Sequence, residues 1–206
     1  MPRAGLSRDA VVRIALEQVD AGGPTGLADL TLAKVAATAG VATPSLYKHV
    51  GSLAALRRHV ALVALEELTT ASAAVTVGRS GADALRALAR AWRAYAAAHP
   101  GRYAATQLAP DPDAPEEAEH RAAATRVVAL VGAVLHGFGL PDDRTVDAVR
   151  AVRAGVHGFV VLESAGGFRL PENLDRSFDA LVDMLVTGVA ALADAPPSPD
   201  QPEEQP

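Results

Sequence analysis

Helix start and stop signals follow one another so closely near the N-terminus that this part of the chain can hold only short helices joined by tight turns. Thr31 can cap a second helix that runs to about residue 39, and Gly40 just past its end accepts a left-handed backbone. Thr43 can cap a third helix whose first residue is Pro44, where the missing N–H costs nothing. Gly51 then ends this third helix after about two turns.

Two longer helices flank this short pair. Ser7 can cap the first helix, which ends near Gly22 and has apolar residues at helical spacing: Val12, Ala15, Leu16 and Val19. Ser52 can cap a fourth helix, whose apolar stripe is formed by Leu53, Leu56, Val60 and Val63. We therefore predict a three-helix domain over residues 1–52, with the fourth helix joining it to the rest of the chain.

Clusters of glycine and proline divide the remainder into about five more helical segments. These clusters occur at residues 78–81, 99–101, 109–115, 139–143 and 166–171. Aromatic residues make up only 4% of the chain and no segment reads as a strand, so we predict an all-α protein of about nine helices. A larger helical domain over residues 53–194 would follow the first, and the proline- and acid-rich residues 195–206 would form a disordered tail.

The chain is acidic as a whole, but its charge is unevenly distributed. Its net charge of −5 combines +3 in residues 1–59 with −8 in residues 60–206, and both lysines, Lys34 and Lys48, lie in the basic part. Contact with the phosphates of nucleic acid requires positive charge, so this basic part is where such contact is expected. The chain has no cysteine, and its longest apolar run, residues 127–135, is too short to cross a membrane. We expect a cytoplasmic protein with no membrane partner.

Two short helices joined by a glycine-containing turn and preceded by a packing helix describe a helix-turn-helix, whose second helix enters the major groove of double-stranded DNA. In that arrangement Thr43, Pro44 and Ser45 would face base edges, because hydroxyls pair with any base and a proline ring can meet a thymine methyl. The groove walls, one turn later, would be met by Tyr47, Lys48 and His49. Alternatively, Tyr47 and His49 only cover a small core and Lys48 is solvated.

The stretch LTLAKVAATAGVATPSLYKHVGSLAAL, residues 30–56, resembles the TetR family of transcriptional repressors. The resemblance implies that Thr31 caps its helix and contacts a phosphate, that Thr43, Pro44, Ser45 and Lys48 read bases, and that Tyr47 and His49 grip the DNA backbone. Leu53 departs from the pattern, because the family commonly has a lysine there. Losing that phosphate contact should weaken binding to all sequences alike, unless Lys34, Arg57 or Arg58 compensates.

Later in the chain, GVHGFVVLESAGGF resembles the Trp-His-Gly type of regulatory domain found in some members of the family, with Val156 in place of the tryptophan. We place a pocket for a small, apolar effector at the centre of the larger domain. Its expected lining is Trp92, Tyr95, Tyr103, Phe138, His157 and Phe159. These aromatic residues could equally be ordinary core.

Residues 143–163 and 175–193 each carry a long apolar seam that needs a partner. We predict that part of each seam fills the core and that the rest forms a homodimer interface, as the resemblance also implies. The predicted interface residues are Val149, Val152, Phe178, Leu181, Leu185 and Val189. A two-fold dimer would bind a palindromic operator and would be released from it by the effector.

Two other classes of protein remain open. An enzyme is disfavoured, because the six histidines form no His-Glu-x-x-His motif, there is no cysteine nucleophile, and GVHGF lacks a serine where a nucleophile elbow needs one. Glu116 and His120 could share a helix face, but two ligands are too few, so we expect no metal and no cofactor. A helical adaptor that has lost DNA binding is the stronger alternative, since Leu53 and the acidic total both favour it.

Overall fold

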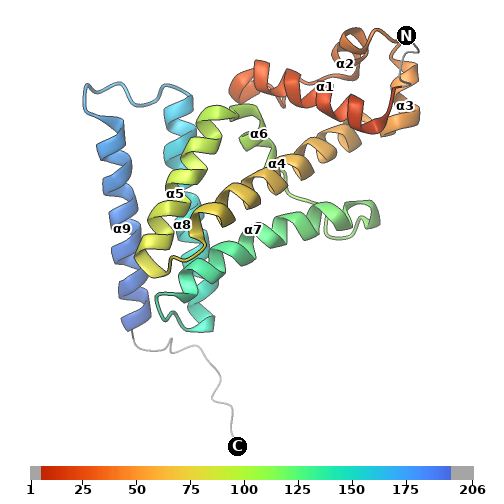
Figure 1. Cartoon of the computed structure of the whole chain (residues 1–206). Helices are drawn as coiled ribbons and strands as arrows, with labels where there is room; N and C mark the ends of the chain where they lie inside the picture. The colour runs from red at the N-terminus through yellow and green to blue at the C-terminus, as the bar shows by residue number, and fades with distance from the viewer. Residues whose placement is uncertain (1–5, 196–206) are drawn as a thin grey trace, which may run out of the picture.

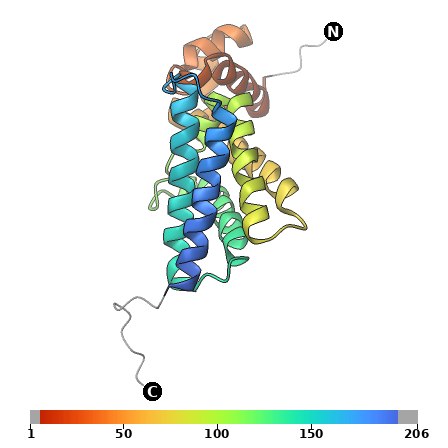
Figure 2. The same cartoon turned by 90° about the vertical axis from the view of Figure 1, so that its left-hand side faces the viewer.

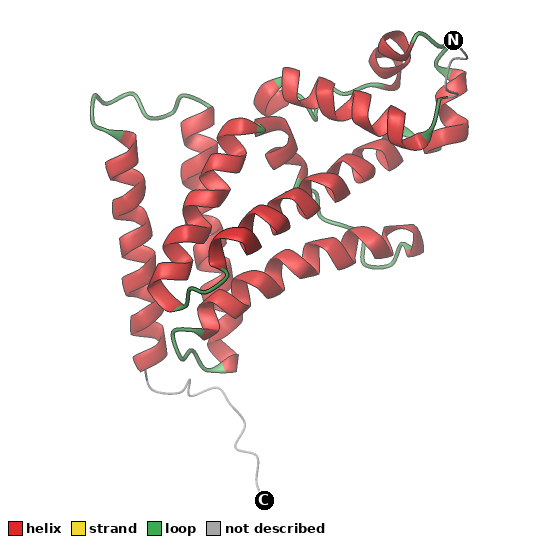
Figure 3. Cartoon of the chain, in the orientation of Figure 1, coloured by secondary structure: helices red, strands yellow, loops and turns green. Residues whose placement is uncertain are grey.

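The computed structural model describes residues 6–195, and this part of the chain contains nine α-helices, two short 3₁₀-helices and no strand (Figure 1 and Figure 3). The predicted all-α class is confirmed. The helices are α1 (Arg8–Ala21), α2 (Leu32–Ala39), α3 (Pro44–Val50), α4 (Leu53–Thr76), α5 (Gly81–Ala98), α6 (Pro100–Ala105), α7 (Ala118–His136), α8 (Asp142–Ser164) and α9 (Leu174–Asp194), with η1 (Gly23–Thr25) and η2 (Pro115–Glu117) between them. Residues 196–206 of the predicted tail lie outside the described part.

The caps that set the short N-terminal helices are those predicted, with one exception. The side chains of Ser7, Thr31 and Ser52 each accept a hydrogen bond from a first-turn N–H of the following helix, and Gly40 has the left-handed φ of 66°. Thr43 does not cap α3: its backbone is already helical and its hydroxyl makes no capping hydrogen bond. The first turn of α3 instead starts from main-chain bonds, with Ser45 N–H donating to the Ala42 carbonyl.

The N-terminal unit has its own core, built by α1, α2, α3 and the first half of α4. Leu46 and Val50 of α3 are buried in it, which leaves the opposite side of α3 exposed. The same core continues along α4 as far as Ala64 and receives Ala105 of α6. The domain boundary after residue 52 therefore stays a prediction, because the packing itself divides within α4.

A second core lies between α4, α5, α7, α8 and α9. Helices α4 and α7 run beside each other, and α8 and α9 form an adjacent pair (Figure 1 and Figure 2). Helix α4 contributes to both cores and so joins the two units.

Candidate DNA-binding interface and effector cavity

The exposed side of α3 carries three of the residues predicted to meet DNA. Pro44, Tyr47 and Lys48 are exposed, and Tyr47 has 52% of its surface in solvent, which is unusual for a large aromatic side chain. Thr43 and Ser45 are half-buried. The reading that Tyr47 merely covers a small core is not supported by this exposure.

His49 is placed less favourably for its predicted role. It is half-buried, and its Nε2 is shielded from solvent and has no hydrogen-bond partner. The Arg8 guanidinium donates to the main-chain carbonyl of His49, 3.2 Å from Nε to O, which ties the end of α3 to α1. A phosphate contact by His49 would therefore have to come through Nδ1.

The three cations expected to replace the missing lysine contact at Leu53 are all engaged within the chain. Lys34 Nζ donates to the Asp29 carbonyl at 2.8 Å, and Arg57 Nη2 donates to the Ala28 carbonyl at 2.9 Å. The guanidinium of Arg58 pairs with the carboxylate of Glu117, just before α7, at 3.0 Å. Each of the three already holds a contact within the chain, so a phosphate contact would have to use their remaining N–H donors. Thr31 is exposed but also serves as the α2 cap.

A small cavity of about 60 Å³ lies inside the second core, between α4, α5, α6, α7 and α8. Two of the residues predicted for an effector pocket, Trp92 and Tyr103, line it. The Trp92 indole N–H donates to the Ser72 hydroxyl at 2.9 Å, so the ring has a fixed position in the wall. Burial raises the pKa of Tyr103 to about 12, so this phenol stays neutral.

The other predicted pocket residues lie elsewhere. Tyr95 points to the junction of α4 and α6, where its hydroxyl donates to Glu67 at 2.8 Å. Phe159 packs on Phe178 of α9, with ring centroids 5.1 Å apart, and Phe138 packs against the core at the end of α7. These three residues do not line this cavity, and their assignment to an effector pocket stays a prediction. An aromatic residue is equally at home in any core, and the sequence does not show which one. His157 lies behind the wall, 3.3 Å from the Tyr103 hydroxyl.

A polar chain along one edge of the cavity was missed. The Arg153 guanidinium donates to the Gln107 amide oxygen at 3.0 Å, the Gln107 amide donates to the Thr106 hydroxyl at 2.8 Å, and that hydroxyl donates to the Tyr103 carbonyl. The side chains of Thr106, Gln107 and Arg153 all line the same cavity, whose other walls are mostly aliphatic. No sequence motif predicts this series of hydrogen bonds, because its members come from α6, the loop after it and α8.

Helix α6, which carries the Tyr103 wall of the cavity, is bonded directly to the N-terminal unit. Arg102 pairs with Asp20 of α1 at 2.7 Å and with Glu67 of α4 at 2.8 Å. One residue earlier, Gly101 lies so close to α1 that an added Cβ would be 2.3 Å from the Val19 carbonyl oxygen. Helix α6 therefore forms one wall of the cavity and also packs on α1, which shares a core with α3.

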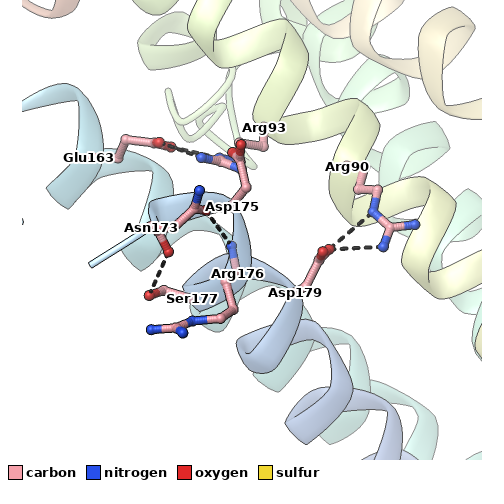
Figure 4. Close-up of polar contacts among 8 residues, drawn as sticks. All are labelled: Arg90, Arg93, Glu163, Asn173, Asp175, Arg176, Ser177 and Asp179. Carbon is pink, nitrogen blue, oxygen red and sulfur yellow. Dashed lines mark hydrogen bonds and ion pairs between the residues drawn. The ribbon is translucent and has the colours of Figure 1, made fainter. Parts of the chain in front are cut away.

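On the other side of the second core, an ion-pair network fixes α9 to α5 and α8 (Figure 4). Arg93 of α5 bridges Glu163 of α8 and Asp175 of α9, at 2.6 and 2.8 Å, and lies over the Phe178 ring at 4.9 Å from its centroid. Arg90 pairs with Asp179 at 2.8 Å. The hydrogen bond with Glu163 raises the pKa of Arg93, so its charge is permanent.

Four residues predicted to form a dimer interface are buried within the protomer itself: Val149, Val152, Phe178 and Val189. Leu181 and Leu185 are half-buried, and Leu185 packs on Gly155 between the two helices. The four buried residues thus fill the protomer's own core, and the assignment of Leu181 and Leu185 to a dimer interface stays a prediction.

The outward sides of α8 and α9 carry small and apolar residues. On α8 they are Ala151, Ala154, Gly158, Val161 and Leu162, and on α9 they are Ala180, Met184, Gly188 and Ala191. We call this set the α8–α9 outer face. Met184 is 65% exposed and Leu162 is 51% exposed, so large apolar groups face solvent in a helix pair that small residues keep flat.

Comparisons with known proteins agree with this architecture. The sequence profile described as "Tetracyclin repressor-like, C-terminal domain" matches residues 85–185. The chain is 38% identical to the uncharacterized HTH-type transcriptional regulator Rv0681 of Mycobacterium tuberculosis, over 91% of this chain and 82% of that protein. It is 30% identical to the similarly described YobS of Bacillus subtilis, over 91% of this chain and 95% of that protein. A solved TetR variant from Acinetobacter baumannii in complex with minocycline has a TM-score of 0.68 at 24% identity, over 92% of this chain and 99% of that chain.

The helix-turn-helix unit, the helical core behind it and these relatives define the class of protein: a DNA-binding transcriptional regulator. The chain belongs to the TetR family of HTH-type regulators. Among residues 6–195, no helix is long and apolar enough to cross a membrane. The cytoplasmic location stays a prediction.

Proposed function

We propose that this protein is a homodimeric repressor that binds a palindromic operator through α3. It is released when a small molecule enters the cavity lined by Trp92 and Tyr103, which we call the cavity behind α6. The observation that carries the proposal is the bonded path from the cavity wall at Tyr103, through Arg102, to Asp20 of α1. A ligand that displaces this wall has a direct way to change the position of the DNA-reading unit.

The cavity is smaller than an effector, so binding of an effector would have to change the protein's conformation. Drug-sized molecules occupy pockets of roughly 300–1,000 Å³, whereas this cavity measures about 60 Å³. An effector of that size can enter only if α6 and α7 separate, and it can shift the protein only by binding the opened state more tightly than the closed one. The minocycline-bound TetR variant shows that a relative with this fold holds a small molecule. The aliphatic walls favour an apolar effector, with one polar group facing Gln107 and Arg153.

The α8–α9 outer face supports a two-fold dimer. Contiguous exposed apolar residues on paired helices mark an interaction surface, and small side chains let two such helix pairs approach closely. One helix-turn-helix module offers few contacts, and a dimer doubles them with half-sites one helical turn or a multiple apart.

Binding of labelled DNA fragments from the region upstream of the gene tests the proposal. We expect a preferred palindrome, binding that falls steeply with salt, and weaker binding for Lys48→Ala with a salt slope lower by about one unit. Arg169→Ala, in the loop between α8 and α9, is the matched control and should leave operator binding unchanged. If no fragment is bound even at low salt, the helical adaptor is the better description.

A further inference from the structure

A second pocket lies where the N-terminal unit meets the larger one, and it shares no residue with the cavity behind α6. We call it the junction pocket. Its volume is about 410 Å³, and its apolar side is formed by Leu53 and Ala54 at the start of α4 and by Leu108 and Ala109 in the loop after α6. This is the size and lining of a site for a small organic molecule.

The polar side of the junction pocket contains a histidine with unused hydrogen-bonding capacity. The side chain of His120, in the first turn of α7, is 3% exposed, and neither of its ring nitrogens has a hydrogen-bond partner. Buried polar groups are nearly always paired, because an unpaired one has lost its hydrogen bonds to water without replacement. His120 lines the pocket, so the missing partner can come from a molecule inside it.

The neighbouring carboxylate of Glu117 is not that partner, because it lies beyond hydrogen-bond distance of the ring. Both oxygens of Glu117 are already engaged, one by Arg58 at 3.0 Å and the other by the main-chain N–H of Asp111 at 2.9 Å. Glu117 Oε2 lies 3.6 Å from His120 Nδ1, which is too long for a hydrogen bond. Because Glu117 is neutralised in this way, its charge does not prevent an anion from binding beside it.

The remaining charged groups of the pocket favour a negatively charged occupant. Arg57 and Arg58 both line it, against the single carboxylate of Glu117, which leaves an excess of one positive charge. Arg57 uses its Nη2 on the α1–α2 connection, while its Nε is buried without a partner. One excess cation, one unpaired imidazole and an aliphatic wall match a monoanion that carries an apolar group.

We propose that the junction pocket binds a small organic monocarboxylate, whose carboxylate meets His120 and Arg58 and whose apolar part packs on Leu53 and Leu108. Leu53 stands at the first position of α4, directly after the turn that follows α3. A bound acid therefore contacts the helix that carries the DNA-reading unit, at a point separate from the effector cavity. The site does not depend on DNA recognition, so it can be tested without an operator.

Titration of the full-length protein with sodium benzoate, against sodium chloride at equal ionic strength, tests this site. The six histidines are labelled with ¹³C in the ring, and the His120 signal is identified by its loss in His120→Leu. We expect saturable movement of the His120 signal and little movement of the others. Neutral benzamide should bind at least about tenfold more weakly, a difference of about 1.4 kcal/mol.

Two variants and one control locate the binding. His120→Leu and Arg58→Gln, each titrated with benzoate by calorimetry, should bind it at least about tenfold more weakly than the unaltered protein. His136→Leu changes an exposed histidine at the other end of the same helix and should bind benzoate as the unaltered protein does. If His120→Leu does not fold, Arg58→Gln decides.

Three results would overturn the proposal. The first is an absence of saturable movement at His120, which would leave an ordered water as the partner. The second is equal affinity in the unaltered protein and Arg58→Gln. The third is quenching of Trp92 without movement of His120, which would place the acid in the cavity behind α6. None of these results bears on operator binding.

Discussion

At the scale of single residues, His120 makes stability depend on pH. Burial lowers its pKa below the ordinary value, with a smaller contribution in the same direction from Arg58 and an opposing one from Glu117. The unfolded chain therefore takes up the proton at higher pH than the folded chain does. Stability is retained above about pH 6.5 and is lost as the pH falls through and below that value.

We predict that His120→Gln loses less stability than the unaltered protein between about pH 7.5 and about pH 5.5, because it removes a group that must be charged on unfolding in acid. Urea unfolding at both pH values measures this difference. His136→Gln replaces an exposed histidine on the same helix and should follow the unaltered protein. Equal losses in all three proteins would contradict the prediction.

Residue-level expectations succeeded where the interaction is local. Thr31, Gly40 and Ser52 cap or end helices through groups within a few positions of themselves, so short-range patterns contain the information. Thr43 failed because the chain entering α3 is already helical, a property set by the fold of the turn. The sequence did not show which aromatic residues line the cavity for a different reason: Tyr95 and Phe159 contact neighbours far along the chain, which composition and spacing do not reveal.

At the scale of helices, the close approach of α6 to α1 depends on Gly101. We predict that Gly101→Ala lowers the free energy of unfolding by about 1–3 kcal/mol, because its Cβ would be 2.3 Å from the Val19 carbonyl oxygen and the two helices must separate. Urea unfolding provides the measurement. Gly132→Ala, inside α7, meets only Thr145 Cγ2 at 3.9 Å and should be neutral or stabilising by up to about 1 kcal/mol. A similar loss in both variants would contradict the role of the contact.

The ion pair between Arg102 and Asp20 should transmit effector binding. We predict that Asp20→Asn leaves effector affinity, read from Trp92 quenching, nearly unchanged but reduces the effector's influence on operator affinity about tenfold, or about 1.4 kcal/mol of coupling. Operator binding with and without effector measures this ratio. Asp83→Asn removes an exposed ion pair between the first turn of α5 and Arg79 in the loop before it, and is the control. Full coupling in Asp20→Asn would show that another contact transmits the signal.

The helices themselves were predictable, but their partners were not. An apolar stripe shows which side of a helix is buried, and α8 and α9 have the stripes expected of them. It does not show whether the cover is the same chain or a second copy, so Phe178 and Val189 were assigned to a partner although they fill the protomer's own core. The outer face escaped notice because alanine and glycine give a weak hydrophobic signal in a sequence.

At the scale of the whole molecule, two cores share α4, and α6 is bonded to both units. Any ligand that moves α4 or α6 therefore changes the orientation of α3 relative to α8 and α9. In a dimer held together through the α8–α9 outer face, this orientation fixes the spacing of the two α3 helices, and only one spacing matches two half-sites. Operator affinity should thus depend on assembly as strongly as on the residues of α3.

We predict that Gly158→Arg makes the protein monomeric and weakens operator binding at least about 100-fold. Gly158 lies in the α8–α9 outer face, and a Cβ placed there meets no atom within 4 Å, so the protomer itself can accept the arginine. A charge in the middle of a closely packed interface would remain unpaired, which costs several kcal/mol. Sedimentation velocity measures the oligomeric state, and Val77→Arg, at an 80% exposed position outside that face, is the control. A Gly158→Arg protein that remains dimeric would show that the subunits meet through another surface, and the half-site geometry would then have to be derived from that surface.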